Sequence, residues 1–148
     1  MGTADPDLLV LDASALVELV VAGEHRAGAD VLLDRYKSDA GLVLISAAHA
    51  LIEATSAIRR MTQHGPLRPE DGTRAVEWLG ELNLVLDATA PRLRRIWTLR
   101  EQMSAYDAAY AAAAEAFEAP LISTDNRLLG ACQAADVAAL HLSDFGAR

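Results

Sequence analysis

Two acidic side chains stand at the ends of short apolar runs that have the composition of buried strands. Asp12 follows the run Leu8–Leu11, and Asp125 comes shortly after Leu121–Ile122. In an open parallel α/β sheet, ligands bind outside the carboxyl ends of the strands. Both carboxylates are therefore candidates for one binding site, although Asp is also a favoured helix N-cap, so a capping role stays open for each of them.

Two further acids lie in segments with helical spacing. Asp107 comes three residues after Ser104, which is the spacing of a capping box, so this acid also has a structural alternative. Glu53 lies about two turns inside a helix predicted over 47–63, where no orphan amide needs an acceptor. Its neighbours at three and four residues are mostly small, so its helix face can approach another element closely. We interpret Glu53 as an exposed residue or a binding residue, and we favour binding.

Four carboxylates that converge on one point repel one another and cannot all stay ionised at neutral pH without a cation. Oxygen ligands select hard ions such as Mg²⁺ or Mn²⁺. The four histidines have none of the spacings of a zinc site, and a single cysteine, Cys132, excludes a Cys-rich site. The sequence therefore predicts a Mg²⁺ or Mn²⁺ site if the four acids meet.

The charged residues disfavour several functional classes. With 21 acidic and 13 basic residues, the formal net charge is −8, which argues weakly against an extended nucleic-acid-binding surface. The four site acids account for part of this charge. Lys37 is the only lysine and no GxxxxGK[ST] sequence occurs, which disfavours a Schiff-base enzyme and a P-loop nucleotidase.

The elements that must position these acids alternate along the chain. Apolar runs predict strands, and segments with helical spacing lie between them. Strands that alternate with helices indicate a three-layer α/β/α fold with a mostly parallel sheet of about five strands. No long linker divides the chain, so we expect a single domain over 1–148. The strands are predicted at 8–11, 42–45, 84–86, 121–122 and 138–140, and the helices at 14–21, 25–37, 47–63, 70–81, 90–103, 105–118 and 126–134.

The start of the chain gives no sign of a membrane segment. Its longest apolar run, Leu8–Leu11, is far shorter than a membrane span or a signal-peptide core, and Asp5 and Asp7 precede it where a signal peptide would be basic. We therefore expect a cytoplasmic protein without a membrane partner.

The sequence strongly resembles the PIN-domain family at these acids, and within it the small VapC-type toxins of toxin–antitoxin modules. VLDASALV at 10–17 is similar to the opening motif, with a metal-binding Asp followed two residues later by Ser. Glu53 occupies the place of the second acid. YDAAY at 106–110 resembles the third motif, and STDNRL at 123–128 resembles the fourth, where Ser123 fills a position that is often Thr. All four acids of the family's quartet are present.

This resemblance implies a metal-dependent endoribonuclease that cleaves a structured RNA and is restrained by a cognate antitoxin. Homodimers are usual in that family. A divalent ion held by carboxylates would supply a bound hydroxide and neutralise charge on the phosphate. The roles implied are direct Mg²⁺ or Mn²⁺ ligands for Asp12, Asp107 and Asp125, a ligand or a water-orienting base for Glu53, carboxylate-fixing hydroxyls for Ser14 and Ser123, and RNA contacts for Asn126 and Arg127. Helix capping stays open for Ser14, and a solvated first helical turn stays open for Asn126 and Arg127.

Other residues have weaker functional interpretations. The arginines at 59, 60, 92, 94, 95 and 100 could bind RNA phosphates or acidic antitoxin residues, but a solvated helix face explains them equally well. Trp78 and Trp97 lie among apolar residues at helical spacing, which favours the core or a dimer interface over base stacking. Cys132 is most simply a small buried residue.

Three rival classes remain to be compared with a nuclease. A phosphoryl-transfer enzyme of the haloacid dehalogenase type resembles DxD at its nucleophile, whereas position 14 is Ser, and it needs a downstream Lys that this chain lacks. A receiver-type signalling domain needs paired acids near the first strand and a late Lys, and neither is evident. The third alternative keeps the fold but makes the chain a non-catalytic PIN-like module that binds RNA or protein.

Overall fold

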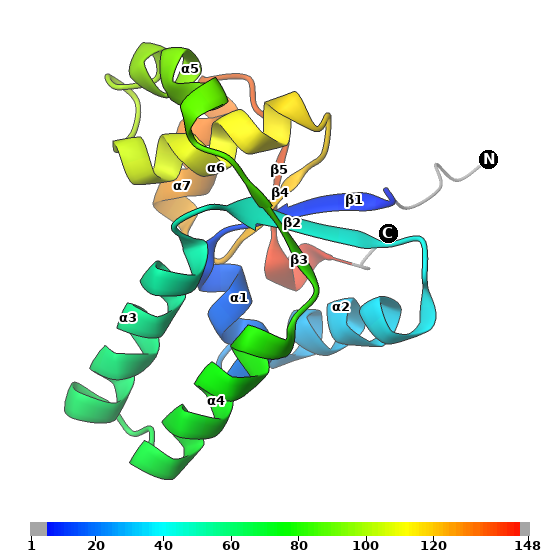
Figure 1. Cartoon of the computed structure of the whole chain (residues 1–148), viewed down its shortest axis with the longest axis vertical. Coiled ribbons are helices and arrows are strands. Elements are labelled where there is room, and N and C mark those ends of the chain that lie inside the picture. Colours follow the sequence, from blue (N-terminus) through cyan, green and yellow to red (C-terminus); the bar gives the residue numbers. More distant parts are fainter. Residues whose placement is uncertain (1–5, 146–148) are drawn as a thin grey trace.

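The computed structural model describes residues 6–145 and contains one five-stranded sheet in which all strands are parallel (Figure 1). The strands are β1 (Leu8–Leu11), β2 (Val43–Ala47), β3 (Leu84–Asp87), β4 (Leu121–Ser123) and β5 (Ala139–His141). The helices are α1 (Ala13–Val20), α2 (Arg26–Ser38), α3 (Ala50–His64), α4 (Pro69–Glu81), η1 (Ala90–Arg92), α5 (Leu93–Thr98), α6 (Ala105–Ala116), α7 (Asn126–Ala134) and η2 (Leu142–Asp144). The predicted α/β fold with a parallel sheet of about five strands is confirmed.

The strand order β3-β2-β1-β4-β5 makes β1 the central strand. Val10 of β1 is in register with Ile45 on one side and with Leu121 on the other. The chain builds the sheet outward from β1 to β3 and then crosses back to place β4 against β1. This reversal creates a topological switch point between β1 and β4, which is where open α/β sheets bind ligands.

Helices cover both faces of the sheet. In Figure 1, α5 and α6 lie on one face, whereas α1, α2, α3 and α4 lie on the other. Helix α6 packs on β1, β2 and β4, and its residues 108–114 are all buried. Six of these seven residues are alanine, and small side chains let the helix axis approach the sheet closely. Close packing of α6 brings its first turn, which carries Asp107, to the carboxyl ends of the central strands.

Several predicted helix boundaries differ from those observed, and two of the differences change the interpretation of the sequence. Helix α3 begins at Ala50 rather than at 47, because β2 continues to Ala47, which pairs with Asp87 of β3. Glu53 therefore lies in the first turn of α3, and its placement two turns inside the helix was wrong. The segment predicted as one helix over 90–103 forms η1 and α5 and ends at Thr98.

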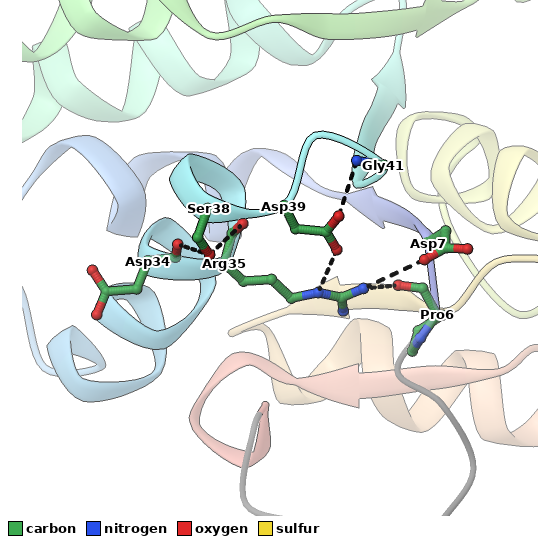
Figure 2. Close-up of polar contacts among 7 residues, drawn as sticks. All are labelled: Pro6, Asp7, Asp34, Arg35, Ser38, Asp39 and Gly41. Carbon is green, nitrogen blue, oxygen red and sulfur yellow. Dashed lines mark hydrogen bonds and ion pairs between the residues drawn. The ribbon is translucent and has the colours of Figure 1, made fainter.

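Arg35 joins three segments at the amino ends of β1 and β2 (Figure 2). Its Nη2 donates to the carbonyl oxygen of Pro6 at 2.6 Å and lies 3.9 Å from a carboxylate oxygen of Asp7, and its Nε lies 3.5 Å from Oδ2 of Asp39. Asp39 Oδ1 in turn accepts a hydrogen bond from the amide of Gly41 at 2.9 Å. This guanidinium therefore fixes the entry to β1 and the turn that leads into β2.

Three single residues complete the comparison with the sequence. Cys132 is buried as predicted, and burial raises the pKa of its thiol to about 11, so it is an unreactive core residue. Trp78 and Trp97 are 55% and 69% exposed in this chain, so neither lies in the core, and the alternative of a dimer interface stays a prediction. Within residues 6–145, no helix has both the length and the apolar character needed to cross a membrane.

Candidate active site

Asp12 is the most buried of the four acids, with 4% of its surface exposed. It directly follows β1 and is the N-cap of α1, where its Oδ1 accepts from the amide of Ala15 at 3.0 Å and from the hydroxyl of Ser14 at 2.7 Å. Its Oδ2 accepts from the hydroxyl of Ser123 at 2.7 Å. Every one of these donors is neutral, so the carboxylate is held in one orientation without a countercharge.

The surroundings of Asp12 disfavour its ionised form. Burial is the main cause that raises the pKa of this carboxyl, and the nearby charge of Asp125 raises it further. The hydrogen bonds from Ser123, Ala15 and Ser14 lower the pKa and only partly compensate. A buried carboxylate in this state gains from any cation that binds beside it.

Ser14 and Ser123 link the carboxyl ends of β1 and β4. Their hydroxyl oxygens lie 3.2 Å apart, and each donates to a different oxygen of Asp12. The Ser14 hydroxyl also accepts from the amide of Thr124 at 3.0 Å, and the Ser123 hydroxyl accepts from the amide of Asp125 at 2.9 Å. The two serines therefore fix the rotamer of Asp12 and the path of the chain that follows β4.

Asp125 and Asp107 each lie at the beginning of a helix. Asp125 is the N-cap of α7 and accepts from the amides of Arg127 at 2.9 Å and Leu128 at 3.4 Å. Asp107 lies in the first turn of α6, and its amide donates to the capping hydroxyl of Ser104 at 3.2 Å. The capping interpretations of Asp12, Asp125 and Ser104 are therefore correct. These caps leave part of each carboxylate free for a ligand, because a carboxylate has about four acceptor positions.

The surroundings of Asp107, including the charge of Asp125, affect its ionisation. Burial raises the pKa of Asp107, and the charge of Asp125 raises it further. The Ser104 hydroxyl, the Arg127 guanidinium and His49 act in the opposite direction. Arg127, an expected RNA contact, thus lies within electrostatic reach of Asp107, while Asn126 occupies the exposed first position of α7.

Glu53 reaches toward the same end of the sheet from α3. Its Oε2 lies 3.1 Å from Nε2 of His49 and accepts from the hydroxyl of Tyr110 at 3.3 Å. Tyr110 is fully buried on α6, and its pKa is raised first by burial and then by the carboxylates of Glu53 and Asp12. The phenol therefore stays protonated and serves as a hydrogen-bond donor to Glu53.

Sequence reasoning did not identify His49 or Tyr110 as part of this site. Each has a local signal, because His49 precedes Glu53 by four residues and Tyr110 follows Asp107 by three, which places each pair on one helix face. The rings of His49 and Tyr110 also contact each other, with centroids 4.9 Å apart. Together they orient Glu53, which a helix pattern alone does not indicate.

The four acids lie near one another but do not form a closed coordination shell. Among the described residues 6–145, no group of three or more His, Cys, Asp or Glu side chains is close enough to hold a metal ion. The chemistry of the donors nevertheless fits Mg²⁺ or Mn²⁺, because Asp12, Asp107 and Asp125 offer only oxygen ligands, and the charge of Asp125 raises the pKa of both Asp12 and Asp107. The residues that would hold the ion are these three, with Glu53 beside them.

Two cavities lie on this side of the molecule. One of about 410 Å³ is lined by Glu53 and Asp107 and opens between α3 and α6. A larger one of about 740 Å³ lies along α7 and β5 and touches none of the four acids. Two of the four acids therefore line the smaller cavity, which adjoins the candidate active site.

Comparison with known protein families identifies the family of this chain. The model of the PIN domain matches residues 9–133, a range that includes all four acids. The chain belongs to the PIN-domain family. Its fold agrees, because the PIN-like structure of PAE2754 from Pyrobaculum aerophilum superposes with a TM-score of 0.67 at 21% identity, covering 95% of this chain and 96% of that one.

Two related PIN-domain proteins are named ribonucleases. VapC ribonuclease Mb0985 of Mycobacterium bovis is 38% identical over 82 residues, which is 55% of this chain and 65% of that protein. Ribonuclease VapC3 of Mycobacterium tuberculosis is 30% identical over 126 residues, covering 85% of this chain and 88% of that protein. The first match thus spans just under two thirds of its relative, whereas the second spans most of both chains.

Proposed function

We propose that this PIN domain is a metal-dependent endoribonuclease that hydrolyses RNA phosphodiester bonds as the toxin of a VapC-type toxin–antitoxin pair. The similarity to proteins named VapC ribonucleases supports the class of reaction. The observation that carries the proposal is the state of Asp12. It is a buried carboxylate at the switch point, it has only neutral donors, and Asp125 stands close enough to raise its pKa.

Each residue of the candidate site has a distinct role in the proposed reaction. A Mg²⁺ or Mn²⁺ ion, held by Asp12, Asp107 and Asp125, would lower the pKa of a water molecule and neutralise charge on the phosphate. Ser14 and Ser123 keep Asp12 in the orientation that the ion needs. Glu53, held by His49 and Tyr110, orients the attacking water and accepts its proton. These tasks are local to the carboxyl edge of the sheet.

Arg127 is the residue proposed to bind the phosphate of the substrate. Its backbone amide donates to Asp125, and its guanidinium acts electrostatically on Asp107. We propose that it contacts the phosphate group next to the cleaved bond and that Asn126, exposed beside it, contacts the same strand. Arginine suits this role because its planar fork binds phosphate oxygens in pairs.

The proposed partners are an RNA, a cognate antitoxin and a second copy of the chain, in the cytoplasm. Large apolar side chains that remain exposed, among them Leu93 and Trp97 on α5, support a protein contact. Light scattering at micromolar concentration tests the homodimer, and a monomeric mass would contradict it.

Cleavage of RNA by the purified protein tests the main proposal. We expect cleavage with Mg²⁺ or Mn²⁺, none with chelator, and none from Asp12→Asn. Asparagine still caps α1, because its side-chain oxygen can accept from the Ala15 amide, so this variant is expected to fold. RNA binding without cleavage by the parent protein would instead assign the chain to the non-catalytic alternative.

A further inference from the structure

The cavity between α3 and α6 is lined by large apolar side chains as well as by two of the catalytic acids. Next to Glu53 stands Ile52, and next to Asp107 stands Tyr106, and both line the cavity. Ile52 is 77% exposed and Tyr106 is 67% exposed, although both are large and apolar. Each acid on this cavity therefore has an exposed apolar neighbour, which indicates a binding surface rather than a solvated rim.

The position of Tyr106 is supported by the same residue that orients Glu53. The His49 ring meets the Tyr106 ring edge-on, with centroids 5.5 Å apart and an interplanar angle of 67°. His49 also lies 3.1 Å from the carboxylate of Glu53. His49 thus contacts both Tyr106 and Glu53. A ligand that stacks on Tyr106 is therefore held in a defined position relative to the Glu53 carboxylate.

We propose that this cavity is the subsite for one unstacked nucleobase of the RNA, next to the cleaved phosphate, with Tyr106 as its stacking surface. The inference rests on the proposed function and adds to it the substrate feature that is recognised. Ile52 supplies apolar contact, and the hydroxyls of Ser56 and Ser104, which also line the cavity, supply hydrogen bonds to the edge of the base.

The location of the cavity favours a nucleobase over a side chain of a protein partner. Glu53 and Asp107 belong both to the cavity and to the catalytic group, so an RNA positioned for cleavage must pass over it. Proteins that recognise single-stranded RNA splay bases out and stack them on aromatic rings. The RNA is therefore required to be unpaired at this nucleotide, whatever its identity.

The test is a thermodynamic cycle between Tyr106 and the base. An oligonucleotide that the parent cleaves is first selected from a random-sequence RNA pool with Mn²⁺, and each nucleotide beside the cleaved bond is then replaced in turn by an abasic one. We expect one abasic position to lower kcat/KM of the parent by about 5- to 150-fold, the range of base–aromatic stacking. Tyr106→Ala should show a similar loss on intact RNA and no further loss on that abasic RNA.

Two further variants make the cycle specific. Tyr106→Phe retains the ring and should retain both the rate and the sensitivity to the abasic nucleotide. Trp78→Ala removes an aromatic ring of comparable exposure on α4, which does not line this cavity, and should behave like the parent.

The possible failures are distinguishable. A parent protein that cleaves no RNA overturns the proposed function and this subsite with it. A parent that cleaves, together with a Tyr106→Ala variant that is unaffected or that loses rate equally on intact and abasic RNA at every position, overturns the subsite alone. Weakened self-association of Tyr106→Ala with unchanged kcat/KM would assign Tyr106 to a contact between protein chains instead.

Discussion

Two strands of the sheet lead into a buried aspartate, and the two aspartates have opposite surroundings. Asp12 follows β1 and is 4% exposed, and Asp87 ends β3 and is 8% exposed. Asp87 accepts two hydrogen bonds from the guanidinium of Arg92, at 2.9 and 3.0 Å. Asp12 accepts only from hydroxyls and an amide. The charge of Asp87 is thus neutralised by Arg92, whereas the carboxylate of Asp12 has no cationic partner among residues 6–145 and is available to a ligand.

Position in the sheet explains this difference. Strand β3 lies at an edge, and the turn after it leads within five residues to Arg92. Strand β1 is central, and its carboxyl end faces that of β4, which brings a second acid, Asp125, toward Asp12. At the amino edge, Arg35 likewise lies between Asp7 and Asp39 (Figure 2). An acid at a strand end therefore indicates a site only where the fold supplies no cation of its own.

The largest expected difference between the site acids and the paired Asp87 is in the rate of RNA cleavage. Asp107→Asn is expected to lower RNA cleavage by more than about 100-fold, which is the upper range for residues that merely orient a metal ligand. The hydrogen bond from the backbone amide of residue 107 to the Ser104 hydroxyl remains, so the helix cap is preserved. Asp87→Asn is the matched control and should cleave at nearly the parental rate, measured as kcat/KM on the same RNA. Undiminished cleavage by Asp107→Asn would remove this residue from the site.

For the free energy of unfolding, we expect the opposite order, with substitution of Asp87 costing more than substitution of Asp12. Asp87→Ala leaves the half-buried guanidinium of Arg92 without its partner and should lower the free energy of unfolding by about 1.5–3 kcal/mol. Asp12→Asn should cost less, because its main hydrogen bonds can be replaced and a desolvated charge is removed. Urea denaturation with chelator present measures both changes. A larger loss for Asp12→Asn would show that its carboxylate is mainly structural.

Metal binding should stabilise the parent and distinguish the acids again. An ion present at one hundred times its Kd adds about 2.7 kcal/mol to the free energy of unfolding by mass action. Asp107→Asn should gain much less, whereas Asp87→Asn should gain the full amount. Thermal unfolding with chelator and with millimolar Mg²⁺ provides the measurement, and equal gains in all three proteins would contradict the ligand role of Asp107.

The smallest expected effect is on the pH dependence of stability without metal. The folded protein raises the pKa of Asp107, so the ionised carboxylate destabilises the fold at pH values above that raised pKa. This penalty disappears as pH falls through the raised pKa toward the ordinary value of 3.8. Asp107→Asn should therefore gain stability relative to the parent at pH 7, and the difference should shrink toward pH 4. A difference that grows on acidification would show that the charge is stabilising.

Much of the fold follows from local patterns that the sequence displays. Strands buried on both faces appear as continuous apolar runs, so all five were predicted within one or two residues. The capping roles of Asp12, Ser104 and Asp125 were also predicted, because a cap bonds to amides only two or three residues away. The same patterns predict one site for the four acids and its metal chemistry, and these stay predictions.

Other features depended on contacts between distant residues. Helix α3 begins later than predicted because the pairing of β2 with β3 extends to Ala47. Glu53 therefore lies in the first helical turn. Glu53 meets Tyr110 across 57 residues, and Ser123 meets Asp12 across 111. The sequence determined which residues could carry charge and hydrogen bonds. Only the tertiary structure decided that Asp87 is paired with Arg92 while Asp12 is left without a cation, because the partner of a buried charge is fixed by distance in space.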